Sequence, residues 1–484
     1  MVFPSIEFAI FFPIVLALSW ALMPWPRFWK PFILVASYGF YAAASPRYCL
    51  LLAAITIANQ LGAVGVHRTA SERARRWIVG VTVAFDLAVL GVFKYYGFFT
   101  DEIGGFLDTI GLGMPLPLLT LALPIGLSFI TFQAISYTVD VKRGLLAPAR
   151  TLDFAVYLSF FPHVVAGPIV RAREFLPQLA KPRDPRTVAV GAGVVLIVLG
   201  LIKKVVLADV LARQVVDPVF GVPLAYAGPD VWLAAYAYAA QIYCDFSGYT
   251  DIAIGVALLA GFIFPQNFNS PYRATSFGDF WRRWHITLSR FLRDFLYIPL
   301  GGNRGGRWRT ARNLMITMVL GGLWHGAAWG FVLWGTVHGL ALVVEHQWRF
   351  WRARAAAEPD SPGAAAVRAV GRVFAPAWVR WAVVFNVVTF AWVLFRAESL
   401  TLAGDFFGQL FVAGPATLWT PLTVAAVVVV IGFQLLPPNP LERLRLRFAS
   451  LPAPALGVVL AVVVAIVGAT VPCDGVPPFI YFQF

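Results

Sequence analysis

His325 lies in the middle of an apolar segment, residues 313–346, that has basic sequence on both sides. A helix rises about 1.5 Å per residue, so His325 would lie roughly 18 Å from Asn313, against a bilayer core of about 30 Å. An ionisable side chain at that depth is a candidate functional group. Imidazole has a pKa of about 6.5, which burial lowers, and it suits a general base near neutral pH. The alternative is a neutral histidine that is hydrogen-bonded inside a packed bundle.

The same segment contains further glycines and histidines. A helix break or close helix packing around His325 is permitted by Gly321, Gly322 and Gly326. His338 and His346 lie nearer the cytoplasmic end, and we interpret both as structural. No HxxxH or HExxH pattern occurs in the sequence, so a metal site is not expected.

Residues 276–297 have the pattern of an amphipathic helix, which begins with a capping box formed by Ser276 and Asp279. His285 falls on the apolar half, which otherwise carries Phe280, Trp281, Trp284, Leu288, Phe291, Leu292 and Phe295. The other half carries Arg282, Arg283, Arg290 and Arg293. We expect this helix in the cytoplasmic interface of a membrane. Its arginines would bind phospholipid headgroups or receive an anionic donor, such as the phosphates of coenzyme A or of a phosphopantetheine arm.

Two other stretches place polar groups among apolar residues. Asp245 and Asp251 belong to QIYCDFSGYTDIAIG, and buried carboxylates could relay protons or bind coupling ions. Pairing with arginines or capping of a broken helix is the interpretation we favour for both. His163 lies in FFPHVVAGPIVRAREFLPQL, where we favour a structural turn residue over a second catalytic histidine.

The remaining candidate motifs carry weaker signals. GGNRGGRWR is glycine-rich and basic but lacks the GxxxxGK[ST] pattern of a phosphate-binding loop. Cys49, Cys244 and Cys473 are too widely spaced for a disulfide framework, and Cys244 is best interpreted as a small core residue. The end of the chain, PCDGVPPFIYFQF, holds two possible nucleophiles, Cys473 and Tyr481. The Tyr481 phenol could carry an acyl group, or its ring could belong to an interfacial aromatic belt.

The composition indicates which elements must position these residues. The 484 residues are 59% hydrophobic and only 13% charged, against about 25% charged in ordinary soluble domains. We therefore predict an all-α, polytopic membrane bundle, in one integral membrane domain without a cleavable signal peptide. The net charge of +14 comes from arginines in short loops, which membrane topology explains, so nucleic-acid binding is not expected. The candidate spans are 5–23, 31–44, 48–66, 77–97, 118–138, 187–208, 231–262, 313–346, 377–395, 419–436 and 453–471.

The distribution of Lys and Arg predicts the sidedness of the loops. Loop 98–117 has three carboxylates and no Lys or Arg, so it is placed outside, and both termini are predicted to be extracytoplasmic. The segment 154–169 has basic loops on both sides, so we interpret it as re-entrant. Lys203 and Lys204 do not fit this scheme. The basic segments placed inside are 24–31, 67–77, 139–153, 171–186, 263–312, 347–375 and 437–450.

Taken together, these motifs resemble the membrane-bound O-acyltransferase family, within it the bacterial branch of alginate O-acetyltransferases and teichoic acid D-alanylation proteins. The resemblance rests on the two motifs quoted above for Asp245 and His163, on residues 264–306, on GGLWHGAAWGFVLWGTVHG and on FIYFQF. It implies a helical bundle around a transmembrane tunnel, with the acyl thioester arriving from the cytoplasm. The catalytic histidines of the family correspond to His325 and His285. The end with Tyr481 is similar to that of a small partner peptide in D-alanylation systems, in which a tyrosine is a proposed acyl relay.

The resemblance also implies a function. The expected activity is transfer of an acetyl group from acetyl coenzyme A or an acyl carrier protein, without a bound cofactor, to an extracytoplasmic polysaccharide. A periplasmic transferase is the expected partner, and the bacterial inner membrane is the expected location. The family core would span about residues 120–400 of the single domain 1–484, with additional helices in 401–484.

Three alternatives stay open. The first is transfer of D-alanyl or another acyl group to a cell-envelope polymer. The second is an ion-coupled transporter that uses Asp245 and Asp251, although transporters often contain internal repeats and we find none in this sequence. The third is a scaffold that only recruits a transferase.

Overall fold

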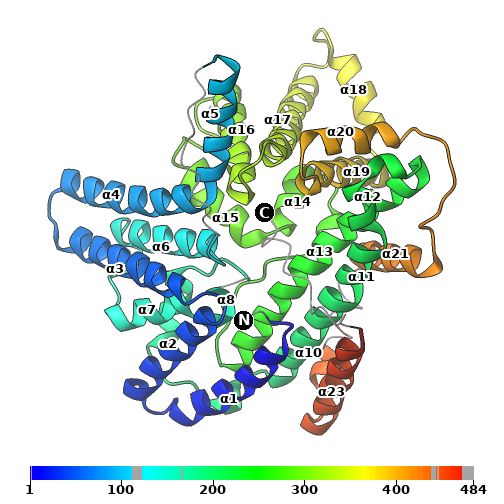
Figure 1. The fold of residues 1–484 in the computed structure, drawn as a ribbon. Helices are drawn as coiled ribbons and strands as arrows, with labels where there is room; N and C mark the ends of the chain where they lie inside the picture. The colour runs from blue at the N-terminus through cyan, green and yellow to red at the C-terminus, as the bar shows by residue number, and fades with distance from the viewer. Residues whose placement is uncertain (2, 112–122, 165–166, 438–442, 444–445, 471–484) are drawn as a thin grey trace. The chain divides into compact units, whose positions relative to one another are not determined.

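The computed structural model is built from helices (Figure 1). It describes all residues except 2, 112–122, 165–166, 438–442, 444–445 and 471–484, and the described residues contain no strand. The chain forms two compact units that alternate along the sequence. Of the described residues, unit 1 comprises those in 1–201, 249–265 and 446–470, and unit 2 comprises those in 202–248 and 266–443.

Unit 1 contains most of the N-terminal helices. They begin where the sequence supplies caps: the Ser5 hydroxyl accepts a hydrogen bond from the Phe8 amide, and the Ser71 hydroxyl accepts one from the Ala74 amide. Helices α3, α4 and α6 lie side by side in Figure 1. The helices wholly in this unit are α1 (Ile6–Leu22), α2 (Pro26–Ala42), α3 (Arg47–Arg68), α4 (Glu72–Leu90), α5 (Tyr96–Thr109), α6 (Leu127–Lys142), α7 (Thr151–Ser159), α8 (Phe161–Val164), α9 (Ala172–Phe175), α10 (Val190–Leu201) and α23 (Ala453–Thr470).

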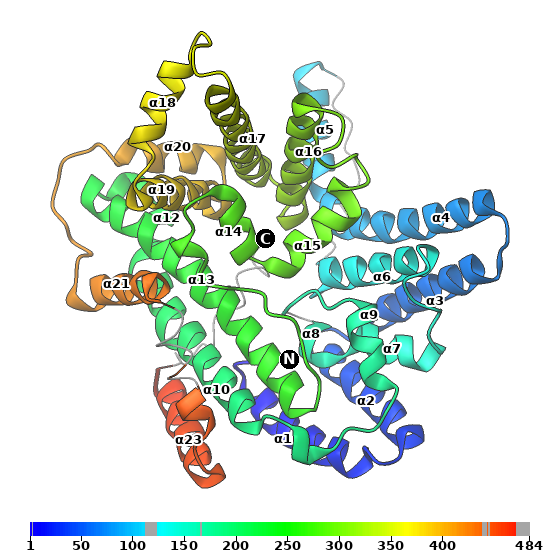
Figure 2. The same cartoon turned by 180° about the vertical axis from the view of Figure 1, so that it is seen from behind.

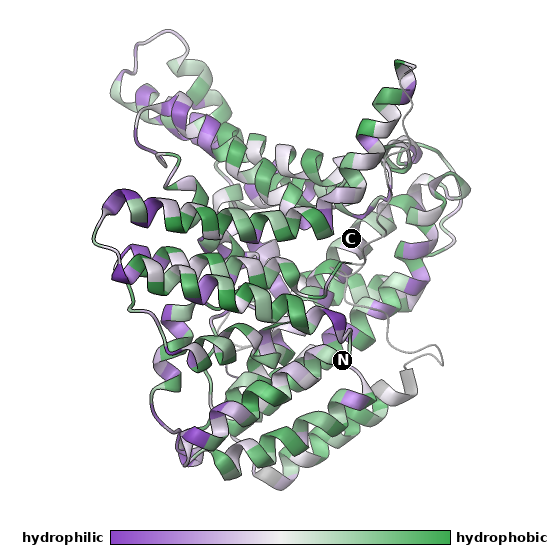
Figure 3. Ribbon diagram, turned by 60° about the vertical axis from the view of Figure 1, so that its left-hand side comes forward, coloured by the Kyte–Doolittle hydropathy of each residue, from purple (hydrophilic) through white to green (hydrophobic). Residues whose placement is uncertain are grey.

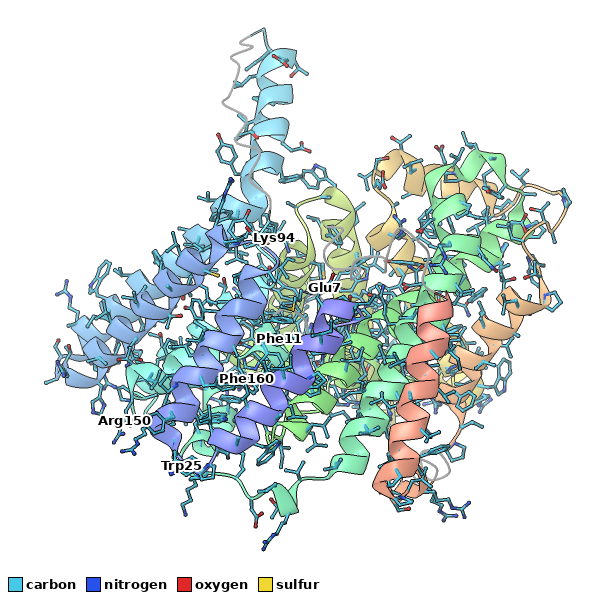
Figure 4. All side chains as sticks on the ribbon, turned by 60° about the horizontal axis from the view of Figure 1, so that its bottom comes forward. Glu7, Phe11, Trp25, Lys94, Arg150 and Phe160 are labelled. Carbon is cyan, nitrogen blue, oxygen red and sulfur yellow. The ribbon has the colours of Figure 1, made fainter. Side chains whose placement is uncertain are left out.

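Ion pairs join three of the loops that were predicted to share the cytoplasmic side. Lys30 Nζ lies 2.5 Å from Asp153 Oδ1, which links segment 24–31 to segment 139–153. Glu72 Oε1 lies 3.5 Å from Lys142 Nζ, which links the loop before α4 to the same segment. Figure 4 shows Arg150 and Trp25 toward the lower edge of the view, away from Glu7 and Lys94. These three loops therefore lie at one end of unit 1, as one side of a membrane requires.

The structure contradicts one expectation about unit 1 and agrees with another. Loop 98–117 was expected to be irregular, but α4 continues through a π-helical turn at Gly91–Tyr95 into α5, and this expectation was wrong up to Thr109. Tyr96–Thr109 contains no proline, so no residue of this stretch prevents the helix from continuing. Segment 154–169 contains the end of α7 and the short α8 in place of one long helix, which agrees with a re-entrant path.

Unit 2 carries the residues that the sequence singled out for chemistry. The long helix α13 (Gly228–Leu259) contributes residues 228–248 to unit 2 and its remainder to unit 1. Figure 2 shows α16 and α17 side by side, with α14 and α15 beside their lower ends. The other helices of this unit are α11 (Asp209–Leu211), α12 (Asp217–Gly221), α14 (Phe277–Arg283), α15 (Ile286–Leu292), α16 (Arg307–His325), α17 (Trp329–Ala357), α18 (Ala364–Val373), α19 (Ala377–Arg396), α20 (Leu400–Gln409) and α21 (Pro421–Leu435).

Several helices have the length and apolar composition that a membrane crossing requires. Among the described residues these are Arg47–Arg68, Glu72–Thr109, Gly228–Leu259 and Ala377–Arg396, with shorter apolar helices at Ile6–Leu22, Pro421–Leu435 and Pro454–Ile466. Figure 3 shows hydrophobic residues along most helices and hydrophilic residues mainly at their ends. The chain is a multi-pass membrane protein, as the composition predicted.

A buried ion cluster in unit 2 explains Lys204, one of the two lysines that did not fit the predicted topology. Lys204 Nζ lies 2.8 Å from Asp209 Oδ1 and 2.6 Å from Asp245 Oδ1, and all three side chains are buried. Asp245 is a paired carboxylate, as we favoured, but its partner is a lysine and not the expected arginine. The cluster joins α13 to the irregular helical segment that follows α10, which gives Asp245 a structural role.

Candidate active site

His325 stands at the turn of a helical hairpin. α16 ends at His325, Gly326 adopts an extended conformation with φ −163° and ψ 157°, and α17 begins at Trp329. The predicted apolar segment 313–346 is therefore two antiparallel helices that meet beside the histidine. A break at the glycines was one of the two expectations for this segment, and the structure confirms it.

Close packing of α16 on α17, the other expectation, is also confirmed. A methyl group added at Gly322 would lie 2.2 Å from the carbonyl oxygen of Phe331, and one added at Gly335 would lie 2.4 Å from that of Met318. Only residues without a β-carbon allow the two backbones to approach this closely. The glycines thus fix where the turn lies, and with it the position of His325.

Aromatic rings enclose the His325 side chain, which is only 3% exposed. Its ring centroid lies 4.9 Å from that of Trp324, 5.1 Å from that of Trp334 and 5.2 Å from that of Phe395. All three rings approach in T-shaped geometry. These rings shield the imidazole from water.

His285 lies at a break in the predicted amphipathic helix. Residues 276–297 were expected to form one helix, and this was wrong, because α14 ends at Arg283 and α15 begins at Ile286. Trp284 between them is extended, and His285 has φ 41°, in the left-handed region. A residue with a β-carbon is uncommon in that conformation, and such strain often marks a functional position.

Part of the predicted capping and burial pattern of this segment is present. The Ser276 hydroxyl accepts a hydrogen bond from the Asp279 amide at 3.1 Å. The apolar half packs inside the protein, where the buried side chains are Phe280, Trp284, Leu288, Phe291 and Leu292.

His285 is fully buried and held by a polar neighbour. Its Nδ1 lies 3.1 Å from Oδ1 of Asn267, and its ring meets that of Phe246 edge-on at a centroid distance of 4.7 Å. His285 lies outside the candidate membrane spans, and burial lowers its pKa to about 3. His285 is therefore neutral at physiological pH.

Both histidines lie close to one ring, that of Trp324. The Trp324 centroid is 4.9 Å from that of His325 and 6.2 Å from that of His285. The structure therefore brings together two side chains that are 40 positions apart in the sequence. We refer to His285, Trp324 and His325 as the histidine site.

The histidine site lies away from the end of α17 that was predicted to be cytoplasmic. Glu345, near that end, accepts a hydrogen bond from the Gly278 amide at the start of α14. One turn further along α14, the ring centroid of Trp281 lies 5.1 Å from that of His338. α14 thus runs beside α17 toward the hairpin turn and delivers His285 there.

The arginines of this segment are exposed to different degrees. Arg283 Nε lies 2.9 Å from Asp279 Oδ2, Arg282 approaches the other oxygen of Asp279 at 3.6 Å, and Arg293 Nε lies 2.7 Å from Asp294 Oδ1. Arg290 is exposed, and within the described part of the chain it has no carboxylate within 4.0 Å. Of these four arginines, Arg290 is therefore the one whose charge no carboxylate of the described residues offsets.

The other predicted candidates lie elsewhere. His163, in unit 1, is fully buried, and its Nε2 lies 2.8 Å from the carbonyl oxygen of Tyr157, which supports the structural role favoured for it. His338 is buried among Phe280, Trp281 and Trp334. Tyr481, like Cys473, lies outside the described residues.

Sequence reasoning missed two members of this region. Asn267 was quoted within a motif but not assigned a role, although it is a polar residue 18 positions before His285 in an aromatic stretch. Trp334 was not considered, although its ring lies between His325 and His338, at 5.1 and 4.8 Å from their centroids. Neither position carries a spacing signal, because both contacts depend on tertiary packing.

Comparison with known proteins gives the family of the chain. Residues 140–378 match the sequence model of the membrane-bound O-acyltransferase family. The chain is 41% identical over 424 residues to the probable alginate O-acetylase AlgI of Pseudomonas aeruginosa, covering 86% of this chain and 75% of that protein. It is 36% identical over 408 residues to a peptidoglycan O-acetyltransferase of Helicobacter pylori, covering 78% of this chain and 73% of that protein. It is 31% identical over 237 residues to a teichoic acid D-alanyltransferase of Streptococcus thermophilus, covering 46% of this chain and 57% of that protein.

Proposed function

Because this chain belongs to the membrane-bound O-acyltransferase family, we propose that it moves an acetyl group from a cytoplasmic thioester across the membrane for O-acetylation of an extracytoplasmic polysaccharide. The observation that carries the proposal is the histidine site, which holds two buried imidazoles beside one ring at the turn of the α16–α17 hairpin. Similarity to proteins described as alginate O-acetylases and as a peptidoglycan O-acetyltransferase supports acetyl as the acyl group.

The chemistry follows from a neutral imidazole in a dry site. An attacking hydroxyl oxygen forms a bond to the thioester carbonyl carbon while His325 takes the hydroxyl proton. The carbon–sulfur bond then breaks, and the leaving thiolate recovers a proton from the imidazolium. A hydrophobic surrounding strengthens the attraction between the imidazolium and the developing negative charge, because little water is present to screen it. His285 serves as the second catalytic histidine in this scheme.

The donor enters from the side of the basic segment. The arginines Arg282, Arg283, Arg290 and Arg293 would bind the phosphates of coenzyme A or of a carrier protein's phosphopantetheine arm. Arg290 makes the first contact, because Arg282, Arg283 and Arg293 already lie beside carboxylates. Guanidinium groups suit this task because they can donate two hydrogen bonds to one phosphate.

The acceptor side involves the C-terminus and a partner. Tyr481 would receive the acetyl group and pass it to a periplasmic transferase, which acetylates the polysaccharide. Similarity to a teichoic acid D-alanyltransferase motivates the alternative of D-alanyl transfer, but it covers a smaller part of this chain than the similarity to the O-acetylases. The whole chain 1–484 is proposed to act as one integral domain in the bacterial inner membrane, with both termini outside.

Deletion of the protein followed by complementation tests this function. The O-acetyl content of the exported polysaccharide is measured in cells that carry the wild type, His325→Gln or His338→Gln. His338 is the matched control, because it is equally buried and also contacts Trp334. We expect O-acetylation to return with the wild type and His338→Gln but not with His325→Gln. Full restoration by His325→Gln would contradict the catalytic assignment, and an unchanged polysaccharide after deletion would contradict the function.

A further inference from the structure

The side-chain oxygen of Asn267 lies within hydrogen-bond distance of three donors. Its Oδ1 lies 3.1 Å from the Thr287 amide nitrogen, 2.8 Å from Thr287 Oγ1 and 3.1 Å from His285 Nδ1. The Asn267 side chain is fully buried. Its backbone carbonyl also accepts a hydrogen bond from the Ile286 amide at 2.9 Å. Asn267 thus satisfies the first two amides of α15 from a distant part of the chain.

This arrangement replaces the usual cap of a helix. The residue in the N-cap position of α15 is His285, and its own side chain makes no capping hydrogen bond. An N-cap residue normally supplies the oxygen that accepts from the first turn. Because Asn267 supplies that oxygen instead, the imidazole of His285 is not needed to cap α15.

The orientation of the Asn267 amide follows from its neighbours. A backbone N–H can only donate, so the atom that faces the Thr287 amide must be the oxygen and not the nitrogen of the side chain. The same oxygen faces His285 Nδ1. The Asn267 oxygen is an acceptor and cannot hydrogen-bond to a nitrogen that presents a lone pair. Nδ1 of His285 must therefore carry a proton. In a neutral imidazole the lone pair then lies on Nε2.

We propose that Asn267 is a positioning residue that holds His285 as the Nδ1–H tautomer, so that Nε2 presents the lone pair that accepts a proton or a hydrogen bond during acyl transfer. The role of His285 in this proposal rests on the proposed function, whereas the tautomer of its ring does not. The left-handed backbone of His285, with φ 41°, and the edge-on ring of Phe246 fix the plane in which Nε2 lies. When Nε2 takes a proton, the Nδ1–H donates more strongly to the amide oxygen, which stabilises the imidazolium.

Nitrogen-15 NMR on membranes tests the tautomer without any turnover. The protein is labelled with 15N-histidine, and the signals of His285 are those that His285→Gln removes from the spectrum. We expect His285 to appear as a neutral ring protonated on Nδ1 in the wild type. In Asn267→Ala we expect that signal to be replaced by the Nε2–H form or by a mixture, because the acceptor is gone. An Nε2–H ring in the wild type, or an unchanged signal in Asn267→Ala, would overturn the proposal.

Acetyl transfer provides the functional half of the test. Asn267→Ala should reduce transfer by about 10² or more, the usual contribution of a well-placed proton acceptor, whereas Asn267→Asp should retain most of it because a carboxylate oxygen accepts the same bonds. Thr287→Val is the matched control, because it removes one bond to the same oxygen and leaves the one from His285. Equal losses in Thr287→Val and Asn267→Ala would assign Asn267 to helix capping alone. If His285 of the wild type is protonated on Nδ1 but the wild type transfers no acetyl group, the proposed function is contradicted and the tautomer is still supported.

Discussion

Replacement of Gly322 by alanine should disturb the hairpin that places His325. The added methyl group would lie 2.2 Å from the Phe331 carbonyl oxygen, whereas ordinary contact begins at 3.4 Å, so the helices must separate by about 1.2 Å. Overpacking of this kind destabilises a protein by about 1–3 kcal/mol, and alanine recovers about 1 kcal/mol through its helix propensity. We expect a net loss of up to about 2 kcal/mol. A displacement of about 1 Å at a reacting group can also reduce the rate by about 10²-fold.

Gly321→Ala is the matched control for this change. A methyl group at Gly321 would meet only the terminal methyl of Leu292, at 3.1 Å, and a leucine side chain can rotate away. The helix-propensity gain is the same at both positions, so Gly321→Ala should be as stable as the wild type or slightly more stable. Thermal unfolding in detergent and acetyl transfer in membranes are measured on both variants. Equal unfolding temperatures and equal transfer for Gly321→Ala and Gly322→Ala would refute the reasoning that glycine contacts position His325.

Three further changes test other parts of the account. Tyr481→Phe should insert normally yet lose acetyl delivery, because it lacks the phenolic oxygen, and full delivery would leave Tyr481 as an anchor. Lys204→Met should destabilise the protein by about 3–5 kcal/mol in thermal unfolding, because it leaves the buried carboxylates of Asp209 and Asp245 without their ammonium partner. A stability like that of the wild type would contradict a structural role for the cluster. Burial lowers the pKa of His285 to about 3. Between about pH 6.5 and 3 the unfolded chain therefore binds a proton at this residue that the folded chain does not. The wild type should lose more stability on acidification from pH 7 to about pH 5 than His285→Gln does. Equal losses in the two proteins would show that His285 is protonated in the folded state.

The helices themselves were largely predictable from the sequence. Long apolar runs marked α3, α13 and α19 within a few residues, because a membrane crossing demands an apolar segment of about that length. The glycines near His325 were recognised as a break or a close contact, and the structure contains both. α5 was missed, because its acidic residues and glycines are typical of a loop.

The sequence singled out the two histidines of the candidate site but not their geometry. His325 was singled out as an ionisable group in apolar surroundings, and His285 through the resemblance to a known family. The break at Trp284 and His285 was not, since neither residue type interrupts a helix and the cap that stabilises the break comes from Asn267, 18 positions earlier. The pairing of Lys204 with Asp245 joins segments 41 positions apart, and no local pattern reports such a contact.

Transfer of label across a sealed membrane tests the central claim most directly. The protein is reconstituted into vesicles of known orientation, and an acetyl thioester that carries a label in the acetyl group is supplied on the side of Arg290. We predict that label reaches a protein or polymer hydroxyl on the opposite side with the wild type and with His338→Gln, and that His325→Gln abolishes this transfer. Equal transfer by His325→Gln, or label confined to the side of the donor in the wild type, would contradict a histidine-catalysed transfer across the membrane.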